Sequence, residues 1–345
     1  PSSTSVFSGA IGPQRGVQQR STAGPILKVA LVSLVSLAIL SSCEASMLWN
    51  SFQDGTDAIF VDVVSPVMET VDGTGDLIIV GAFDTVNGAT VSNVAWLDSD
   101  GRRIEGFDVE TTGGVVNAAV LVDRGGELFL VLGGDFTAVT ATDDTSAARD
   151  GLAAVDLNGN VVDWLNVSID PGTSGTANVY GLAVTELGKL WVGGDFAGVG
   201  LGSGSDRTYR TLCRIDIAGG AVDNGIDPAP DGPVYDLSLG QNLAGNERLL
   251  VVGEFTTLDS ASPTSAVLAA VISETASEWA IEHAATAATL QTDETTPALY
   301  SGAYNYGLDD RVSYVAGGFV DDDQVYSRVV DFRPDYDSTG DPLTP

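Results

Sequence analysis

The amino-acid sequence predicts an all-β fold, and three features support this prediction. The 345 residues include 41 glycines, and glycine favours turns over the interior of helices. Lysine, a good helix former, occurs only at Lys28 and Lys189. β-Branched and aromatic residues recur in short runs bounded by glycine, aspartate or serine. Such runs are typical of strands separated by turns.

The charge balance excludes one class of function. The chain has 15 lysines and arginines against 47 aspartates and glutamates, for a formal net charge of -32. A surface that follows the phosphates of a nucleic acid needs clustered basic side chains, so we expect no nucleic-acid partner. Hydrophobic residues make up 44% of the chain and charged residues 18%, which is enough apolar material for a packed core.

The N-terminal segment predicts export. Residues 1–42 contain Arg15, Arg20 and Lys28 but no acidic residue, and the apolar run from Val29 to Leu40 follows the last of these bases. Twelve residues at about 1.5 Å each cannot cross a hydrocarbon core of about 30 Å. The run therefore matches the hydrophobic region of a signal peptide.

The residues after this run resemble the lipobox of bacterial lipoproteins. They read Leu40-Ser41-Ser42-Cys43. The resemblance implies that residues 1–42 are removed, that Cys43 is acylated, and that residues 43–345 form the mature domain on a bacterial envelope, either periplasmic or at the cell surface. The alternative is an ordinary secretory signal with an incidental cysteine. The chain starts with Pro1, so we expect the reading frame to be incomplete at one or both ends.

A repeat of about sixty residues organises the rest of the chain. Five apolar segments end in a phenylalanine, and these phenylalanines are 53, 60, 59 and 64 residues apart. The segments are 77–83, 130–136, 190–196, 250–255 and 314–319. A repeat of this length fits one four-stranded antiparallel sheet.

Alternating patterns and turn residues place four strands in each repeat. The first strand precedes the anchor segment, at 58–64, 115–122, 179–185, 234–239 and 298–304. The anchor is the second strand. The third strand is expected at 94–98, 153–156, 213–216 and 328–331, and a short fourth strand near Phe107, Trp164, Val222 and Trp279. We expect the anchor glycines to allow close approach of neighbouring backbones, and the anchor phenylalanines to pack between adjacent sheets.

This layout predicts a five-bladed β-propeller. The fifth repeat stops after its third strand, and Ser46–Phe52 supplies the missing fourth strand, with Trp49 in the position of Trp164 and Trp279. Pairing the two chain ends in one blade would close the ring. If the chain is a fragment, further blades are expected.

The repeats resemble the bacterial delta-sixty β-propeller repeats, over about residues 46–333. The hallmark Gly-Gly-Asp-Phe stands at 133–136 and 193–196, a weaker form ends at Glu254-Phe255, and Ala82 and Gly318 depart from the pattern. The resemblance implies a surface or secreted propeller and no catalytic residues. We expect the acids Asp135, Asp195 and Glu254 to accept backbone hydrogen bonds at a strand end.

Few residues are candidates for catalysis or for cofactor binding. His283 is the only histidine, and we expect it in an exposed loop. Cys213 occupies the position of Ala95, Ala153 and Ala270 in other repeats, so we expect a buried core thiol. The glycine-rich stretch 198–204 is expected to be a loop. No organic cofactor is predicted.

The abundant acids support several alternatives. Asp62 and Asp236 lie on first strands and are the best candidates for a catalytic carboxylate pair across a central funnel. The densest oxygen clusters, which are candidates for Ca²⁺ binding, are Asp143, Asp144, Asp321, Asp322 and Asp323. The alternative to both kinds of site is that the acids form a solvated, salt-tolerant surface.

The favoured function is a lipid-anchored envelope propeller that binds a protein or polysaccharide through its loops. One alternative is a carbohydrate-active hydrolase or lyase with funnel carboxylates, and another is a scaffold fragment of a larger repeat adhesin. Tyrosines in or beside the first strands are either core residues or platforms for a sugar: Tyr180, Tyr235, Tyr300, Tyr304 and Tyr306.

Overall fold

The computed structural model describes the repeats but not the N-terminal segment. The described residues are 67–70, 76–98, 100–171, 177–200, 211–223, 226, 228–241, 246–255, 257–258, 267–274, 278–286, 298–304, 313–321 and 324–332. Cys43, Asp62 and the predicted closing strand 46–52 lie outside them. Among the described residues every regular element is a strand, so the all-β prediction is confirmed.

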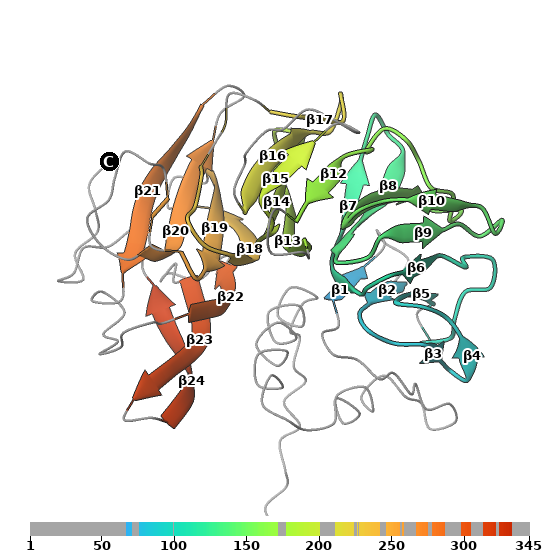
Figure 1. Ribbon diagram of the computed structural model, residues 1–345, viewed down its shortest axis with the longest axis horizontal. Helices are drawn as coiled ribbons and strands as arrows, with labels where there is room; N and C mark the ends of the chain where they lie inside the picture. Colours follow the sequence, from blue (N-terminus) through green and yellow to red (C-terminus); the bar gives the residue numbers. More distant parts are fainter. Residues whose placement is uncertain are drawn as a thin grey trace, which may run out of the picture.

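Each of the five anchor segments contributes the second strand of its own antiparallel sheet (Figure 1). The first sheet contains β1 (Val67–Thr70), β2 (Leu77–Val80) and β5 (Val94–Leu97). The second contains β7 (Val116–Asp123), β8 (Leu128–Gly134) and β11 (Leu152–Asp156). The third contains β13 (Asn178–Val184), β14 (Lys189–Asp195), β16 (Leu212–Asp216) and β17 (Ala221–Val222). The fourth contains β18 (Val234–Gln241), β19 (Glu247–Gly253), β20 (Val267–Glu274) and β21 (Trp279–Thr286). The fifth contains β22 (Ala298–Tyr304), β23 (Ser313–Asp321) and β24 (Gln324–Phe332).

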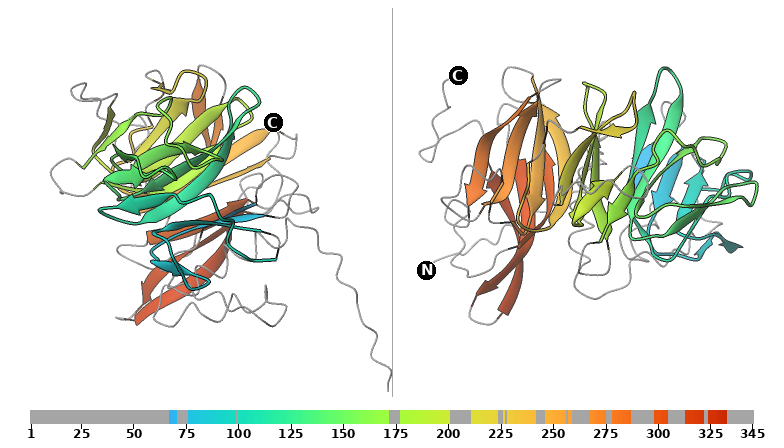
Figure 2. Two further views of the ribbon diagram at one scale, coloured as in Figure 1. Left: turned by 90° about the vertical axis from the view of Figure 1, so that its right-hand side faces the viewer. Right: turned by 45° about the horizontal axis from the view of Figure 1, so that its top comes forward.

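The sheets follow one another in sequence order. Contacts between first strands run from β1 to β7, β13, β18 and β22. Figure 1 shows the resulting arc, with the first sheet and the fifth sheet at its two ends. Figure 2 shows the same order of colours from two further sides. The first strand of each repeat therefore lies on the inner side of the arc, against the first strand of the next repeat.

Strand register shows that the repeats are equivalent in structure. The small residues of the third strands were predicted to occupy equivalent positions. Each of them pairs with the residue four positions before the anchor phenylalanine: Ala95 with Ile79, Ala153 with Leu132, Cys213 with Val192 and Ala270 with Val251. All four small residues are fully buried. The core position of Cys213 is thus confirmed, and burial raises the pKa of its thiol.

The anchor glycines mark close contacts, as predicted. A Cβ on Gly133 would lie 2.6 Å from Cγ1 of Val179, and a Cβ on Gly193 would lie 2.6 Å from Cγ1 of Val234. Both valines belong to the first strand of the next sheet. A side chain at either glycine would therefore push adjacent sheets apart.

The apolar core lies between consecutive sheets. Phe136 packs with residues of the first and second sheets, Phe196 with the second and third, and Phe255 with the third and fourth. All three rings are buried. Because each phenylalanine contributes to a core shared by two sheets, its burial stabilises the association of neighbouring repeats.

The predicted fourth strands are partly wrong. Val222 lies in β17 and Trp279 begins β21, as expected, but Phe107 and Trp164 lie outside strands. In the first two repeats the fourth strand is reduced to a single bridge, between Leu97 and Arg103 or between Val155 and Val161. The two aromatic rings instead pack edge-on against Trp96 and Phe129, at centroid distances of 5.4 and 5.8 Å. Aromatic packing between side chains thus replaces further backbone pairing.

Two other predicted positions differ from the structure. The strand that pairs with the first anchor is Val67–Thr70, which is closer to that anchor than the predicted 58–64. His283 lies in β21, paired with Val271, and not in a loop. Both differences arise because ladder pairing between strands, rather than local composition, fixes where a strand begins and ends.

Short strands tie the loops together at one end of the sheets. They are β3 (Thr85–Val86), β4 (Ala89–Thr90), β6 (Glu110–Thr112), β9 (Ala138–Thr140), β10 (Ser146–Ala148), β12 (Ser168–Asp170) and β15 (Gly198–Gly200). β15 lies in the stretch predicted as a loop and pairs with β12. β12 also connects two repeats, because Ile169 N–H donates to the carbonyl of Asp150 in the preceding repeat.

Candidate functional site

A β-bulge recurs near the start of the inner strands. In β7, β13, β18 and β22 the pairing register shifts across one residue, and these residues are Asn117, Tyr180, Tyr235 and Tyr300. A bulged residue leaves the ladder and its side chain is re-aimed, which is why bulges are common beside binding sites. Four of the five repeats therefore have one extra residue at the same position of the inner strand.

The acids of the anchor motif lie at this same end of the sheets. β14 ends at Asp195, which pairs with Asn178 at the start of β13. The amides of Asp135 and Glu254 donate to the carbonyls of Val115 and Pro233, just before β7 and β18. We call the described side chains at this level the inner-strand band: Asn117, Asp135, Asn178, Tyr180, Asp195, Tyr235 and Glu254.

Contacts within the inner-strand band connect three consecutive sheets. Nδ2 of Asn117 donates to Oδ1 of Asn178 at 2.5 Å, from the second sheet to the third. The rings of Tyr180 and Tyr235 join the third sheet to the fourth, with centroids 5.5 Å apart and planes tilted by 58°. The hydroxyl of Tyr235 donates to Oε2 of Glu254 at 3.1 Å. Side-chain contacts within the band therefore extend from the second sheet to the fourth.

Burial and nearby carboxylates shift the pKa of Tyr180. Burial raises the pKa of Tyr180 above its ordinary value, and the negative charges of Asp195 and Asp135 raise the pKa further. Tyr180 and its ring partner Tyr235 are both partly buried. The ring of Tyr180 thus lies in the field of carboxylates from its own repeat and from the preceding one.

The three anchor acids do not share one role. Oδ1 of Asp135 accepts the N–H of Val115 at 2.6 Å, as predicted. Glu254 instead accepts the hydroxyl of a tyrosine, and Asp195 is exposed and acts on Tyr180 through its charge. The expectation of a backbone acceptor is therefore confirmed for Asp135, whereas among the described residues Glu254 accepts the hydroxyl of the bulged Tyr235.

The proposed catalytic pair is not assembled by the described residues. Asp236 follows the bulge of β18, is partly buried, and accepts the N–H of Leu237 with Oδ1 at 2.8 Å. Asp62 lies outside the described residues. The structure therefore places one carboxylate of this pair beside the inner-strand band.

The predicted calcium ligands lie in turns. Asp143 and Asp144 connect β9 to β10, both are exposed, and hydrogen bonds from the Thr145 hydroxyl and amide lower the pKa of Asp143. Asp321 ends β23 and pairs with Gln324, whereas Asp322 and Asp323 lie outside the described residues. Within the described ranges no three His, Cys, Asp or Glu residues are grouped to hold a metal ion.

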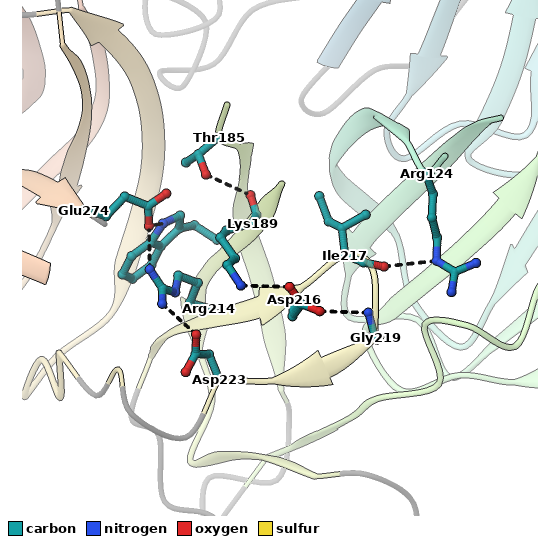
Figure 3. A network of polar contacts seen from close by, with 10 residues as sticks. Arg124, Thr185, Lys189, Arg214, Asp216, Ile217, Gly219, Asp223 and Glu274 are labelled. Atoms are coloured by element: carbon teal, nitrogen blue, oxygen red, sulfur yellow. Dashed lines mark hydrogen bonds and ion pairs between the residues drawn. The ribbon is translucent and has the colours of Figure 1, made fainter. Parts of the chain in front are cut away.

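A second polar network joins the sheets at the opposite end (Figure 3). Arg214 is fully buried and forms ion pairs with Asp223 at 2.6 Å and with Glu274 of the fourth sheet at 3.1 Å. Oε2 of Glu274 also accepts the indole N–H of Trp191 at 2.8 Å. Nearby, Lys189 pairs with Asp216 at 2.8 Å. Because the side chains of Arg214 and Glu274 are buried, we assign this network to stability.

The sequence predicted possible roles for Tyr180, Tyr235 and Tyr300 but indicated none for Asn117 and Asn178. One signal could have found Asn117: each bulged residue directly follows an aliphatic residue near the start of the first strand, as in Val116-Asn117 and Val179-Tyr180. Asn178 gives no such signal, because its role depends on the sheet beside it.

Comparisons with known proteins give weak structural likenesses. No protein-family model and no curated protein matches the sequence. The chain is similar to Raptor from Chaetomium thermophilum, with 10% identity, a TM-score of 0.41 and coverage of 86% of this chain but 24% of that one. It is also similar to a sialidase of Trypanosoma rangeli in complex with sialic acid, with 12% identity, a TM-score of 0.29 and coverage of 82% and 57%. A structure of BBS1N in complex with ARL6DN shows 11% identity, a TM-score of 0.32 and coverage of 83% and 98%.

A search of the described residues for a helix long and apolar enough to span a bilayer found none.

Proposed function

We propose that the chain is a five-bladed β-propeller that works as a binding module, and that its ligand docks on the inner-strand band. The observation that carries this proposal is the recurrence of the β-bulge at Asn117, Tyr180, Tyr235 and Tyr300. A bulge interrupts the ladder and leaves one residue unpaired. Its repetition at one level of four sheets is expected where the inner strands serve a common ligand.

The propeller architecture is supported by the order of the sheets. Inner strands contact each other in sequence order from β1 to β22, and apolar cores lie between consecutive sheets. We propose that Ser46–Phe52 completes the fifth sheet beside β24 and closes the ring. Closure would hold the bulged residues at fixed positions around one axis, which lowers the entropic cost of ligand binding.

The chemistry of the band suits recognition of a protein or polysaccharide at the cell surface. Tyrosine offers a rigid apolar face together with a polar tip, and the carboxylates of Asp195 and Glu254 are exposed hydrogen-bond acceptors. We further propose that acylation of Cys43 anchors the module to a bacterial membrane. Replacing Cys43 by serine in the producing bacterium should abolish incorporation of radiolabelled palmitate and release the protein from the membrane fraction.

The binding site is tested by comparing ligand capture by the full chain and by two variants. The probes are a glycan array and a peptide array, each screened with fluorescently labelled protein. Tyr180→Ala should lose the captured ligand, because the ring pair with Tyr235 is removed. Leu187→Ser is the matched control, because Leu187 is exposed in the turn between β13 and β14, at the opposite end of the sheets. Equal capture by both variants would reject the inner-strand band as the site.

A further inference from the structure

The pair formed by Tyr180 and Tyr235 has acids beside both of its members. Asp195 ends the strand that pairs with β13, which carries Tyr180, and Glu254 accepts the hydroxyl of Tyr235. The two rings come from adjacent sheets and are tilted by 58°, so their faces point in different directions. Two aromatic faces flanked by carboxylates form a surface with negative potential from two sources.

We propose that the group recognised at this ring pair is an organic cation, that is, an ammonium or guanidinium group. This inference rests on the proposed function and specifies the chemical class of its ligand. A cation over the face of a tyrosine is attracted by the ring quadrupole, and the same cation can form charge-assisted hydrogen bonds to Asp195 or Glu254.

The charge balance of the described residues supports this assignment. Each of the seven arginine or lysine side chains that the structure describes in detail has a contact elsewhere: Arg102 with Asp100, Arg103 with Asp108, Arg124 with the carbonyl of Ile217, Arg149 with Asp163, Lys189 with Asp216, Arg214 with Glu274 and Arg248 with the carbonyl of Glu247. None of these seven side chains forms an ion pair with Asp135, Asp195 or Glu254. A ligand that covers these carboxylates must compensate their charge, because burial of an uncompensated charge is costly.

The field of the carboxylates reaches the aromatic surface itself. Burial contributes most to the raised pKa of Tyr180, and the negative charges of Asp195 and Asp135 raise the pKa further, so these two carboxylates place a negative potential at the Tyr180 hydroxyl. A neutral sugar would gain from stacking but would not use this field. A metal ion would use the carboxylates but not the ring faces, and the described residues hold no group of three metal-ligating side chains.

Isothermal titration of the full chain at constant ionic strength tests the inference. The probes are spermidine, a short arginine-containing peptide, its citrulline counterpart, and the neutral oligosaccharide maltohexaose. We expect the arginine peptide to bind and the citrulline peptide to bind at least about tenfold more weakly, because citrulline keeps the shape but lacks the charge. Binding of spermidine as well would identify a free amine as a sufficient ligand, whereas binding of the peptide alone would identify a protein side chain.

Four variants distinguish a specific site from a diffuse acidic surface. Tyr180→Leu should weaken binding of the arginine peptide about two- to fivefold, and the double variant Asp195→Asn/Glu254→Gln should weaken it by about tenfold or more. The single variant Asp195→Asn should weaken it to a smaller extent, and Glu127→Gln, which also removes one charge, is its control, because Glu127 is exposed in the turn between β7 and β8 at the other end of the sheets. An equal effect of Glu127→Gln and of Asp195→Asn alone would overturn the inference.

The remaining outcomes distinguish this inference from the proposed function. Binding of maltohexaose that is lost in Tyr180→Leu, without binding of any cation, would overturn the inference and leave the inner-strand band as a binding site. Absence of binding by all probes here, together with equal capture by both variants in the array experiment, would reject both.

Discussion

At the scale of single residues, two features link this sequence to its structure: glycines that allow close approach, and a tyrosine in a negative field. The anchor glycines were predictable, because a repeated Gly-Gly pair inside an apolar strand indicates a backbone contact. Their partners were not predictable. Val179 and Val234, which fill the space beside Gly133 and Gly193, belong to different repeats and meet the glycines only after folding.

The contact at Gly193 makes a direct prediction about stability. Gly193→Ala should lower the free energy of unfolding by about 1–3 kcal/mol, because the added methyl group overlaps Cγ1 of Val234. Urea denaturation measures this value. Gly125→Asn is the control, because Gly125 has a positive φ of 70° but open space around its Cβ position, and asparagine tolerates that conformation. A larger loss in Gly125→Asn than in Gly193→Ala would contradict the role of the contact.

The titration of Tyr180 gives a second prediction. Its pKa is raised above 10.0 by burial and then by Asp195 and Asp135. Because the folded value exceeds the unfolded one, this group's contribution to stability is present below pH 10 and is lost as the pH rises through the folded value. NMR of ¹³Cζ-tyrosine-labelled protein should show a lower pKa for Tyr180 in Asp195→Asn, though still raised by burial. The same titration in Glu127→Gln should match the wild type. An unchanged Tyr180 pKa in Asp195→Asn would refute the electrostatic coupling between Asp195 and Tyr180.

At the scale of elements, a buried ion network joins the third sheet to the fourth (Figure 3). Arg214 occupies a register position that holds Trp96 and Ala154 in the first two repeats. Local sequence gives little reason to expect a charge there, because the neighbouring residues of β16 are buried. Glu274, at the end of β20, explains the arginine, and the two residues meet only when the sheets pack together.

Replacement of Arg214 should destabilise the folded protein. Arg214→Met leaves Glu274 without its ion-pair partner and should lower the free energy of unfolding by about 3–5 kcal/mol. Adding Glu274→Gln should recover part of this loss, because a neutral amide removes the uncompensated charge and still accepts the Trp191 N–H. Lys189→Met is the control, since its partner Asp216 is 38% exposed, and should cost no more than about 1 kcal/mol. Equal losses for Arg214→Met and Lys189→Met would contradict a special role for the buried pair.

At the scale of the whole molecule, the proposed ring predicts that both edges of β24 are hydrogen-bonded. One edge pairs with β23, and Ser46–Phe52 is proposed for the other. Hydrogen exchange should then show protection along the whole of β24. Leu48→Pro removes a backbone donor and should expose the amides on the outer edge of β24, while the amides of β19, between two neighbours, serve as an internal control. Unchanged exchange in β24 would reject closure by this segment.

Much of the fold, but less of the candidate site, could be predicted from the sequence. The alternation of apolar residues, the turns and the repeated anchors determined the second strands, the small buried slot at Cys213 and the packing of the anchor phenylalanines between sheets, because these depend on patterns within one repeat. The short fourth strands near Phe107 and Trp164 were wrong, since a ring can satisfy its burial by side-chain packing without joining a ladder.

Only the tertiary structure decided which residues act together. The bulges at Asn117, Tyr180 and Tyr235 arise from a register shift between paired strands, and the aliphatic residue before each of them does not by itself specify that shift. The contact of Asn117 with Asn178 and the contact of Tyr180 with Tyr235 each join different repeats. The sequence by itself determined what each repeat is made of. The packing of one repeat against the next decided the site, because its members are about sixty residues apart along the chain and adjacent only in space.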